Sequence, residues 1–381
     1  MGGRGVFPKL RSILIRAGWV GTKNQRSPGW GDWATPFPKT PLSFEHPLCL
    51  CYNFSVKLSE LGEFGLIDLL AKMAGGGDER LLIGIGDDAA AWQGDDSIQL
   101  ATVDSFFEGV HFTPQTTPWP DIGGKALAIN LSDIAAMGGI PRYALVSLAL
   151  PEDSQVEDVA ALYNGMLKRA KEYGVTVVGG DISKAPLVAI SVTVLGSSPT
   201  NNILTRSSAK PGETVAVTGH LGAAAAGMEL LNSHRRTDPE AESRLKNAFL
   251  HPVPRIAEGL LLVEQGVKTA IDISDGLVAD LGQIGKASNV GARLEVERVP
   301  IEPAVKTAFG ERALELALSG GEDYELLFTA STEIVEKVKK AASLTVTVIG
   351  EIVAGKGVTL VDKEGQPFKL KKAGWEHFSQ R

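Results

Sequence analysis

Acidic residues recur in this sequence at the ends of apolar segments, often beside glycine. They stand in Gly86-Asp87-Asp88, Thr102-Val103-Asp104, Gly179-Gly180-Asp181, Asp272-Ile273-Ser274-Asp275 and Gly320-Gly321-Glu322-Asp323. Carboxylates at strand ends face the crevice in which layered folds bind ligands, and unpaired charges are costly to bury. Mg²⁺ takes oxygen ligands and bridges to substrate phosphates, while glycine lets backbone N–H groups approach phosphate oxygens. The pattern therefore predicts Mg²⁺-dependent nucleotide chemistry.

Each of these segments also has an ordinary structural interpretation. Gly-Asp-Asp and Gly-Gly-Asp are common in tight turns. Ser274 and Asp275 could cap the helix expected over 277–289, and Asp133 could pair locally within a helix of small residues. Five acidic strand ends in one chain favour a shared ligand. The sequence has neither a Walker A pattern nor the protein-kinase motifs, so phosphoryl transfer would need a different phosphate cradle.

The elements that must position these residues form two groups. A linker is expected at 196–202, and each group has a strand that ends in acidic residues before a helix of small residues. Small residues on one side of the helix over 121–137 predict a closely packed neighbour. The first group has helices over 58–73, 121–137 and 156–174, two strands joined by an acidic glycine turn over 81–92, and strands over 98–106, 143–151, 175–181 and 187–196. The second has strands over 213–219, 271–277, 292–299, 318–329 and 345–352, helices over 254–265, 277–289 and 332–342, and a polar stretch over 232–247.

Charge and cysteine content divide the chain near residue 55. The 381 residues carry a net charge of −7, yet residues 1–55 hold seven basic and two acidic residues, so the remainder is strongly acidic. This disfavours a nucleic-acid binder, and no apolar run is long enough to predict a membrane span. Cys49 and Cys51 lie too close together for a four-ligand zinc site. The rest of the chain, residues 56–381, is called the body below; it has no cysteine, which suits the reducing cytoplasm. We expect 1–55 to be a disordered or non-native extension with an alternative start at Val56, or alternatively a transit peptide.

Six motifs of the body closely resemble those of the thiamine-monophosphate kinase family, within the aminoimidazole-ribonucleotide synthetase-like ATP-binding superfamily. They are IGIGDDAA (83–90), KALAINLSDIAAMG (125–138), VVGGDIS (177–183), LTRSSAKPGE (204–213), IDISDGL (271–277) and LSGGEDYEL (318–326). The resemblance implies an α+β (α/β layered) PurM-like fold of two domains. The N-terminal domain, 56–197, would hold a mixed sheet that forms a dimer interface, and the C-terminal domain would span 203–381.

The resemblance also implies transfer of the ATP γ-phosphate onto thiamine monophosphate, giving thiamine diphosphate without a covalent phosphoenzyme. Catalysis would rest on positioning and charge neutralisation, and the enzyme would be a cytoplasmic homodimer. The implied Mg²⁺ ligands are Asp88, Thr102, Val103 through its main-chain carbonyl, Asp104, Asp133, Asp181, Asp272 and Asp275. The implied ATP contacts are Tyr163, Gly180, Asp181, Arg206 and Ser274. The implied thiamine contacts are His111, Glu322 and Trp375, whose aromatic face suits a cationic thiazolium ring.

Other functions remain open from the sequence. Taken alone, His111, Arg206 and Trp375 would be an ordinary histidine, a surface ion-pair partner and an apolar anchor. A sister enzyme could use another acceptor, although the body lacks the cysteine of a selenophosphate synthetase and the chain ends HFSQR where a hydrogenase-maturation relative would end in cysteine. A non-catalytic nucleotide-binding protein would have lost its metal carboxylates, whereas every one expected is present. Turnover with ATP, Mg²⁺ and thiamine monophosphate separates these functions.

Overall fold

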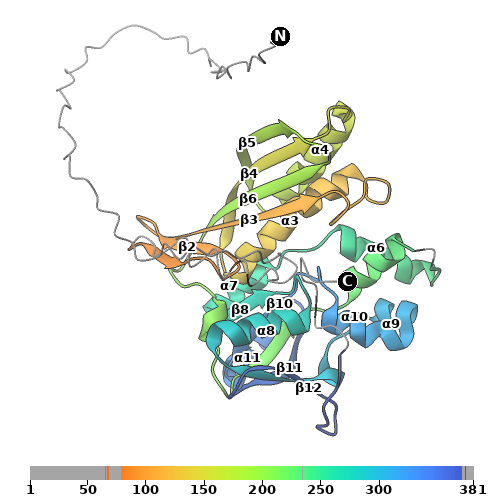
Figure 1. The fold of residues 1–381 in the computed structure, drawn as a ribbon. Coiled ribbons are helices and arrows are strands. Elements are labelled where there is room, and N and C mark those ends of the chain that lie inside the picture. The colour runs from red at the N-terminus through yellow and green to blue at the C-terminus, as the bar shows by residue number, and fades with distance from the viewer. Residues whose placement is uncertain (1–64, 66, 68–78, 234, 371–373, 375–381) are drawn as a thin grey trace, which may run out of the picture. The chain divides into compact units, whose positions relative to one another are not determined.

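The structure is a computed structural model that describes residues 65, 67, 79–233, 235–370 and 374 of the chain. Within these ranges the chain forms two six-stranded sheets flanked by helices, which confirms the predicted α+β class (Figure 1). No helix of the described part has both the length and the apolar character needed to cross a membrane. The extension over 1–55, most of the helix expected over 58–73, and Trp375 lie outside the described residues.

The first sheet has strand order β1-β2-β3-β6-β4-β5, and its neighbouring strands are antiparallel except for the parallel pair β4 and β5. Its strands alternate between two faces. On one face, Val146 and Leu148 are buried in a core that they share with apolar residues of the helices at 119–136 and 156–172. On the opposite face, Tyr143 and Leu145 are exposed. The elements are β1 (Leu81–Ile83), β2 (Ala90–Gln93), β3 (Ile98–Phe107), α3 (Trp119–Ala136), β4 (Ile140–Leu150), α4 (Val156–Glu172), β5 (Thr176–Lys184) and β6 (Ala189–Ser197).

Glycine allows close packing around α3, as the small residues of this segment predict. A Cβ atom at Gly123 would lie 1.9 Å from the carbonyl oxygen of Leu162 in α4. A Cβ atom at Gly165 of α4 would lie 1.8 Å from the carbonyl oxygen of Pro120. Contacts this short exclude any larger residue unless the helices separate. The helix that carries Asp133 is therefore held at a fixed distance from its neighbour.

The second sheet has strand order β12-β9-β11-β7-β10-β8, with β9 and β12 parallel and the other neighbours antiparallel. Apolar residues of α8 pack on one face of it, and those of α7 and α11 pack on the other. The elements are η1 (Arg206–Ser208), β7 (Thr214–Thr218), α5 (Ala223–Leu231), α6 (Pro239–Leu250), α7 (Ile256–Glu264), β8 (Thr269–Asp272), α8 (Leu277–Ser288), β9 (Gly291–Glu295), η2 (Val296–Arg298), α9 (Pro303–Phe309), η3 (Gly310–Arg312), α10 (Ala313–Ser319), β10 (Leu326–Ala330), α11 (Thr332–Ala341), β11 (Val346–Val353) and β12 (Gly357–Val361).

Two segments differ from the sequence prediction. The expected polar stretch over 232–247 contains much of α6, which buries a narrow apolar stripe at i, i+4 and i+8 formed by Ala241, Leu245 and Phe249. Asp238 caps this helix by accepting hydrogen bonds from two backbone N–H groups of its first turn. The strand expected over 318–329 begins only at Leu326, because α10 and a glycine-containing loop precede it.

Candidate active site

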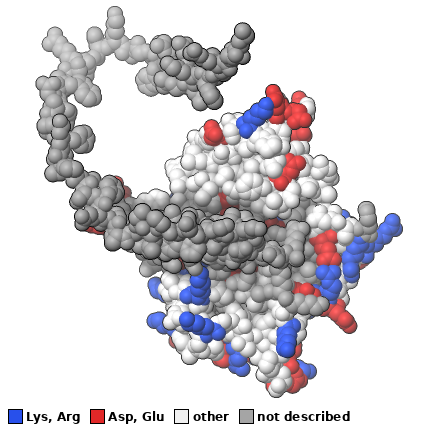
Figure 2. All heavy atoms as spheres, in the orientation of Figure 1, with Lys and Arg blue, Asp and Glu red and all other residues white. Residues whose placement is uncertain are grey.

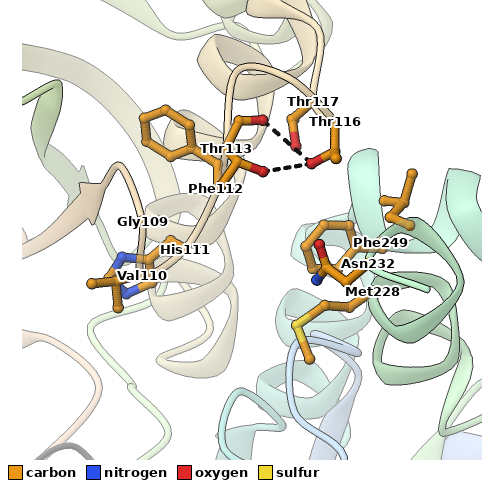
Figure 3. A pocket seen from close by; sticks show the side chains of 11 residues that line it. Gly109, Val110, His111, Phe112, Thr113, Thr116, Thr117, Met228, Asn232 and Phe249 are labelled. Carbon is orange, nitrogen blue, oxygen red and sulfur yellow. Dashed lines mark hydrogen bonds between the residues drawn. The ribbon is translucent and has the colours of Figure 1, made fainter.

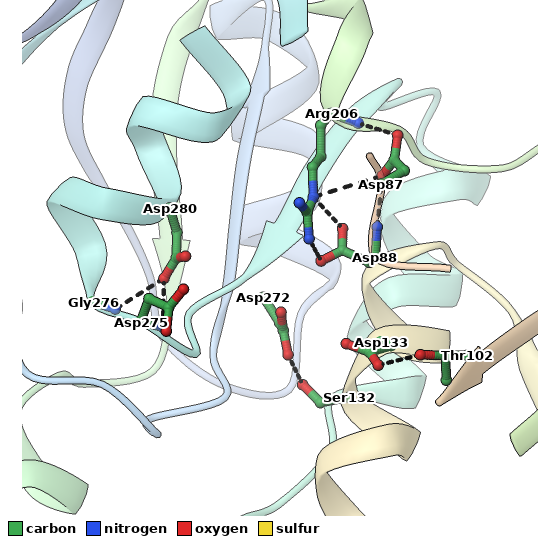
Figure 4. A network of polar contacts seen from close by, with 10 residues as sticks. All are labelled: Asp87, Asp88, Thr102, Ser132, Asp133, Arg206, Asp272, Asp275, Gly276 and Asp280. Carbon is green, nitrogen blue, oxygen red and sulfur yellow. Dashed lines mark hydrogen bonds and ion pairs between the residues drawn. The ribbon is translucent and has the colours of Figure 1, made fainter. Parts of the chain in front are cut away.

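Three carboxylates from separate segments converge between the two sheets (Figure 4). Asp88 follows β1, Asp133 lies in α3, and Asp272 ends β8. One carboxylate oxygen of each lies within 4.8 Å of the other two. Burial, followed by repulsion from Asp88, raises the pKa of Asp272 to about 8. Burial and three neighbouring carboxylates raise the pKa of Asp133 well above its ordinary range. These three residues are called the acid cluster below.

Each member of the acid cluster accepts a hydrogen bond from a neighbouring segment. The Oγ1 atom of Thr102 donates to Asp133 over 2.5 Å. The Oγ atom of Ser132 donates to Asp272 over 2.5 Å, which joins the two halves of the body. Arg206 donates to both carboxylate oxygens of Asp88, over 2.7 and 3.2 Å. Thus α3, β3 and the segment that enters η1 all fix the cluster.

Arg206 supplies one positive charge to this acidic environment. Burial opposes its charge, but the carboxylates of Asp88 and Asp87 outweigh burial and raise the pKa of the guanidinium. Asp87 is itself buried next to Asp88, which raises its pKa to about 6, and it accepts a hydrogen bond from the backbone N–H of Arg206 over 3.0 Å. Arg206 and Lys286 line the same cavity as seven aspartates, so the site favours further positive charge.

The donors of the acid cluster fit a hard divalent cation. Carboxylate and hydroxyl oxygens are the ligands that Mg²⁺ prefers, and a cation among them would offset the repulsion between the carboxylates, which adds to burial in raising the pKa values of Asp133 and Asp272. Asp104 adds another carboxyl group whose pKa is raised by burial and then by Asp88. Its backbone N–H donates to the side chain of Asn130 in α3, over 2.9 Å. The end of β3 is thereby held against the helix that carries Asp133.

A large cavity of about 1470 Å³ surrounds the acid cluster. It brings together most of the residues that the sequence predicts for the site, from β1 to the loop before β10. Those residues are Asp88, Thr102, Val103, Asp104, His111, Asp133, Arg206, Asp272, Ser274, Asp275 and Glu322. The chain therefore gathers metal-type ligands, a guanidinium and polar groups around one space.

Three predicted ATP contacts do not line this cavity. Tyr163 of α4 packs against the core of the first sheet, while Gly180 and Asp181 are exposed on the edge strand β5. The register places Gly180 beside Val146 and, two strands further on, Asp104. Three strand spacings are about 14 Å, and Asp181 points to the opposite face from Asp104 because neighbouring residues alternate. Asp104 and Asp181 of one chain therefore cannot bind the same ion. Trp375 lies outside the described residues.

The loop that carries Glu322 has a strained backbone held at several points. Glu322 and Tyr324 have positive φ angles of 68° and 50°, which are unfavourable for residues with side chains. Their backbone N–H groups donate to the carbonyl oxygens of Ser274 and Ile273 over 2.8 and 2.9 Å. Between them, Asp323 accepts hydrogen bonds from the backbone N–H groups of Gly222, just before α5, and Ala224 within it. These contacts hold Glu322 and Tyr324 at the wall of the cavity.

A smaller cavity of about 200 Å³ adjoins the large one (Figure 3). It lies between the loop at 109–117 and the helices α5 and α6, and Val110, His111 and Met228 line both cavities. The Nδ1 atom of His111 accepts a hydrogen bond from the backbone N–H of Phe107 over 3.0 Å. The histidine ring is therefore fixed where the two cavities meet.

Several residues of the site were not predicted from the sequence. Asp280 of α8 is buried and accepts hydrogen bonds from the backbone N–H groups of Asp275 and Gly276, so it shapes the loop after β8. Lys125 is buried beside Glu322, and Tyr324 lines the large cavity. Ser132 and Lys125 both belong to the motif at 125–138, and the spacing of Lys125 two intervals of four residues before Asp133 was a signal that could have found it; Ser132 adjoins Asp133 and has no such signal.

Comparison with known proteins agrees with this geometry. The AIR synthase related protein N-terminal domain matches residues 86–198, and the C-terminal domain of the same proteins matches residues 210–363. The thiamine-monophosphate kinase of Aquifex aeolicus is 37% identical over 326 residues, 85% of this chain and 100% of the relative. That of Bacillus subtilis is 38% identical over 306 residues, 78% of this chain and 93% of the relative.

A solved structure of AaThiL complexed with AMPPCP and TMP has a TM-score of 0.76 to this chain at 37% sequence identity. The match covers 85% of this chain and 99% of that one. The predicted two-domain PurM-like fold is confirmed. With relatives this similar over nearly their whole length, the chain belongs to the thiamine-monophosphate kinase family, among the AIR synthase related proteins.

Proposed function

We propose that this protein transfers the γ-phosphate of ATP to the phosphate of thiamine monophosphate, giving thiamine diphosphate and ADP in the cytoplasm. The observation that carries the proposal is the large cavity, where the buried acid cluster, Arg206 and the loop of Glu322 meet. The family supplies the substrates: relatives are named thiamine-monophosphate kinase, and the similar AaThiL structure holds AMPPCP and TMP.

Asp88, Asp133 and Asp272 would hold Mg²⁺, with Thr102, the carbonyl oxygen of Val103, Asp104 and Asp275 available to further ions. Bound Mg²⁺ would supply charge neutralisation for the ATP phosphates. The fit rests on the close approach of three carboxylates, of which Asp88 and Asp272 are buried and Asp133 is half-buried. Burial and the neighbouring carboxylates raise the pKa values of Asp133 and Asp272. Their burial also keeps the ligands in fixed directions, which is what positioning catalysis requires.

The chain's own residues orient the two substrates. Arg206 and Ser274 would contact the ATP phosphates, since a guanidinium offers paired N–H donors to phosphate oxygens. His111 and Glu322, on other walls of the same cavity, would contact thiamine monophosphate. A carboxylate at Glu322 would attract the cationic thiazolium ring, and Trp375 remains a prediction as its aromatic partner.

We further propose that the protein acts as a homodimer through the outer face of the first sheet. Val103, Tyr143 and Leu145 expose large apolar side chains there, and such patches usually mark an interface. Figure 2 shows few charged side chains over the visible part of this sheet, apart from its upper end. Asp181 lies on the same outer face. In a dimer, a role for Gly180 and Asp181 in ATP and Mg²⁺ binding would fall to the active site of the partner subunit.

Turnover with a panel of phosphate acceptors tests the proposed reaction. Purified protein is given ATP, Mg²⁺ and, separately, thiamine monophosphate, thiamine, or a non-thiamine phosphate monoester. We expect ADP and thiamine diphosphate in equal amounts with thiamine monophosphate, and ADP formation at background with the others. ATP consumption that depends on another acceptor would overturn the proposed substrate.

A further inference from the structure

A buried lysine lies behind the wall of the active-site cavity. Lys125 of α3 is 1% exposed, and its Nζ atom is 3.0 Å from the Oε2 atom of Glu322. The same Nζ atom lies 3.3 Å from the ring centroid of Phe249 in α6. Burial lowers the pKa of Lys125 despite the opposing effect of Glu322. Burying an ammonium group is unfavourable unless it is well paired, so a contribution to stability alone does not explain a lysine at this position.

The position of Lys125 on α3 separates it from the reacting groups. Lys125, Ile129 and Asp133 follow one another at intervals of four residues and so share a face of the helix. Ile129 and Asp133 line the large cavity, whereas Lys125, further along the same face, does not. Lys125 can therefore act on a bound molecule only through its neighbours, of which Glu322 and Phe249 are the nearest and the ring of Phe106 is 5.9 Å away. Glu322 and Phe249 line the large and the small cavity respectively.

The backbone at Glu322 is already fixed, but its side chain has several rotatable bonds. The backbone N–H group of Glu322 donates a hydrogen bond to the carbonyl oxygen of Ser274. The side chain of Asp323 accepts one from the N–H group of Gly222, just before α5. With 24% of its side chain exposed, the glutamate reaches solvent in the cavity and would adopt several rotamers if nothing held it. Its ion pair with Lys125 selects one of them. Phe249, on the other side, holds the ammonium group through a cation–π contact.

We infer that Lys125 is a positioning residue that holds the Glu322 carboxylate in one direction for recognition of the cationic half of the thiamine substrate. The inference rests on the proposed function, because it needs a substrate that carries a positive ring. The ordering of Glu322 takes place before the substrate arrives, so the substrate avoids that entropic cost. Loss of Lys125 should weaken the binding of thiamine monophosphate while leaving ATP binding intact.

The test is a double-mutant cycle on steady-state kinetics. For Lys125→Met, we expect KM for thiamine monophosphate to rise by about tenfold and KM for ATP to change by less than about twofold. In the Glu322→Gln background, the same lysine substitution should change KM for thiamine monophosphate by less than about twofold. Lys168→Met is the matched control, since this lysine is exposed on α4, and its kinetics should equal those of the wild type.

Three results would overturn the inference while leaving the reaction itself in place. They are an unchanged KM for thiamine monophosphate in Lys125→Met, an equal rise in KM for both substrates, and a full rise in KM when Lys125→Met is added to Glu322→Gln. A wild-type protein that forms no thiamine diphosphate would instead overturn the proposed function, and the inference with it. If Lys125→Met fails to fold, the double variant, which lacks both charges, is compared with Glu322→Gln alone. Equal KM values for thiamine monophosphate would support the inference, and a higher KM in the double variant would overturn it.

Discussion

Among single residues, the acid cluster combines deep burial with like charge. Asp88 and Asp272 are 8% and 2% exposed, and burial together with neighbouring carboxylates raises the pKa values of Asp133 and Asp272. Such an arrangement weakens the ligand-free fold, so packing alone does not explain it. Hydrogen bonds from Thr102 and Ser132 hold the carboxylates in place. The cluster is therefore best understood as a site whose stability is completed by a cation.

Neutralising one carboxylate should separate catalysis from folding. We expect Asp133→Asn and Asp272→Asn each to lower kcat by about 100-fold or more, because the charge that would hold Mg²⁺ is lost. The melting temperature of the metal-free protein should stay the same or rise, since repulsion is relieved. Asp153→Asn, at an exposed turn, is the control. Near-wild-type turnover of either variant at limiting Mg²⁺ would remove that residue from the metal site.

The raised pKa values also predict how Mg²⁺ stabilisation depends on pH. Asp272 has a pKa of about 8 in the folded protein against an ordinary value of 3.8, so the folded state holds a proton that the unfolded state releases. Its contribution to stability is therefore full below about pH 4 and is lost as pH rises towards 8. Because Mg²⁺ needs ionised ligands, the rise in melting temperature on adding Mg²⁺ should be larger near pH 8.5 than near pH 6. Thermal melting checks this.

An equal Mg²⁺ effect at both pH values would contradict the assignment of these buried carboxylates as ligands. Asp272→Asn provides the internal comparison, because it removes one of the titrating groups. Its melting temperature should respond less to Mg²⁺, and the difference between the two pH values should shrink. Asp153→Asn should behave like the wild type.

At the level of elements, α3 organises the site. One helix carries Asp133 and Ser132 at the acid cluster, Asn130 beneath β3, and Lys125 behind Glu322. Its distance from α4 is fixed by Gly123 and Gly165, which leave no room for a Cβ atom. Displacement of α3 would thus disturb several parts of the cavity together.

A methyl group at the α3–α4 contact should therefore destabilise the protein. Gly165→Ala places a Cβ atom 1.8 Å from the carbonyl oxygen of Pro120, and we expect the free energy of unfolding to fall by about 2 to 3 kcal/mol. Gly282→Ala in α8 is the matched control, because a Cβ atom there meets nothing within 4 Å. It should leave stability unchanged or raise it slightly. Equal urea midpoints for the two variants would contradict the packing argument.

Much of the site follows from local sequence, and the rest depends on long-range contacts. Acids at strand ends and a small-residue helix predicted a shared site, and Asp88, Asp133 and Asp272 do lie together. They come from the first sheet's side, from α3 and from the second sheet, so contacts between the two sheets, rather than one sheet edge, bring them together. The pairing of Lys125 with Glu322 joins residues 197 positions apart, and no local pattern specifies it. Helix α6 was missed because its apolar stripe is narrow among many charged residues.

For the molecule as a whole, contacts between distant segments define the cavity. Asp88 pairs with Arg206, Ser132 with Asp272, and Lys125 with Glu322, and each pair lies more than 100 residues apart in sequence. Both halves of the described chain thus contribute residues to one site. The outer face of the first sheet takes no part in these contacts and exposes apolar side chains.

A charge on this outer face should prevent dimer formation. Leu145 is 41% exposed in β4, so Leu145→Glu can be accommodated by the single chain but would be unfavourable against a second apolar face. We expect light scattering after gel filtration to give a dimer mass for the wild type and a monomer mass for this variant. Val253→Glu, at an exposed apolar residue of the other half, should remain dimeric. A monomeric wild type would contradict the proposed interface.

The most direct test of the central claim follows the γ-phosphate itself. ATP labelled in the γ-phosphate is incubated with the protein, Mg²⁺ and thiamine monophosphate, and the label is located after separation of the products. The proposed reaction places the label in the terminal phosphate of thiamine diphosphate, one per ADP formed, with Asp272→Asn as the inactive reference. Label that appears as free phosphate, at a rate independent of thiamine monophosphate, would contradict the account.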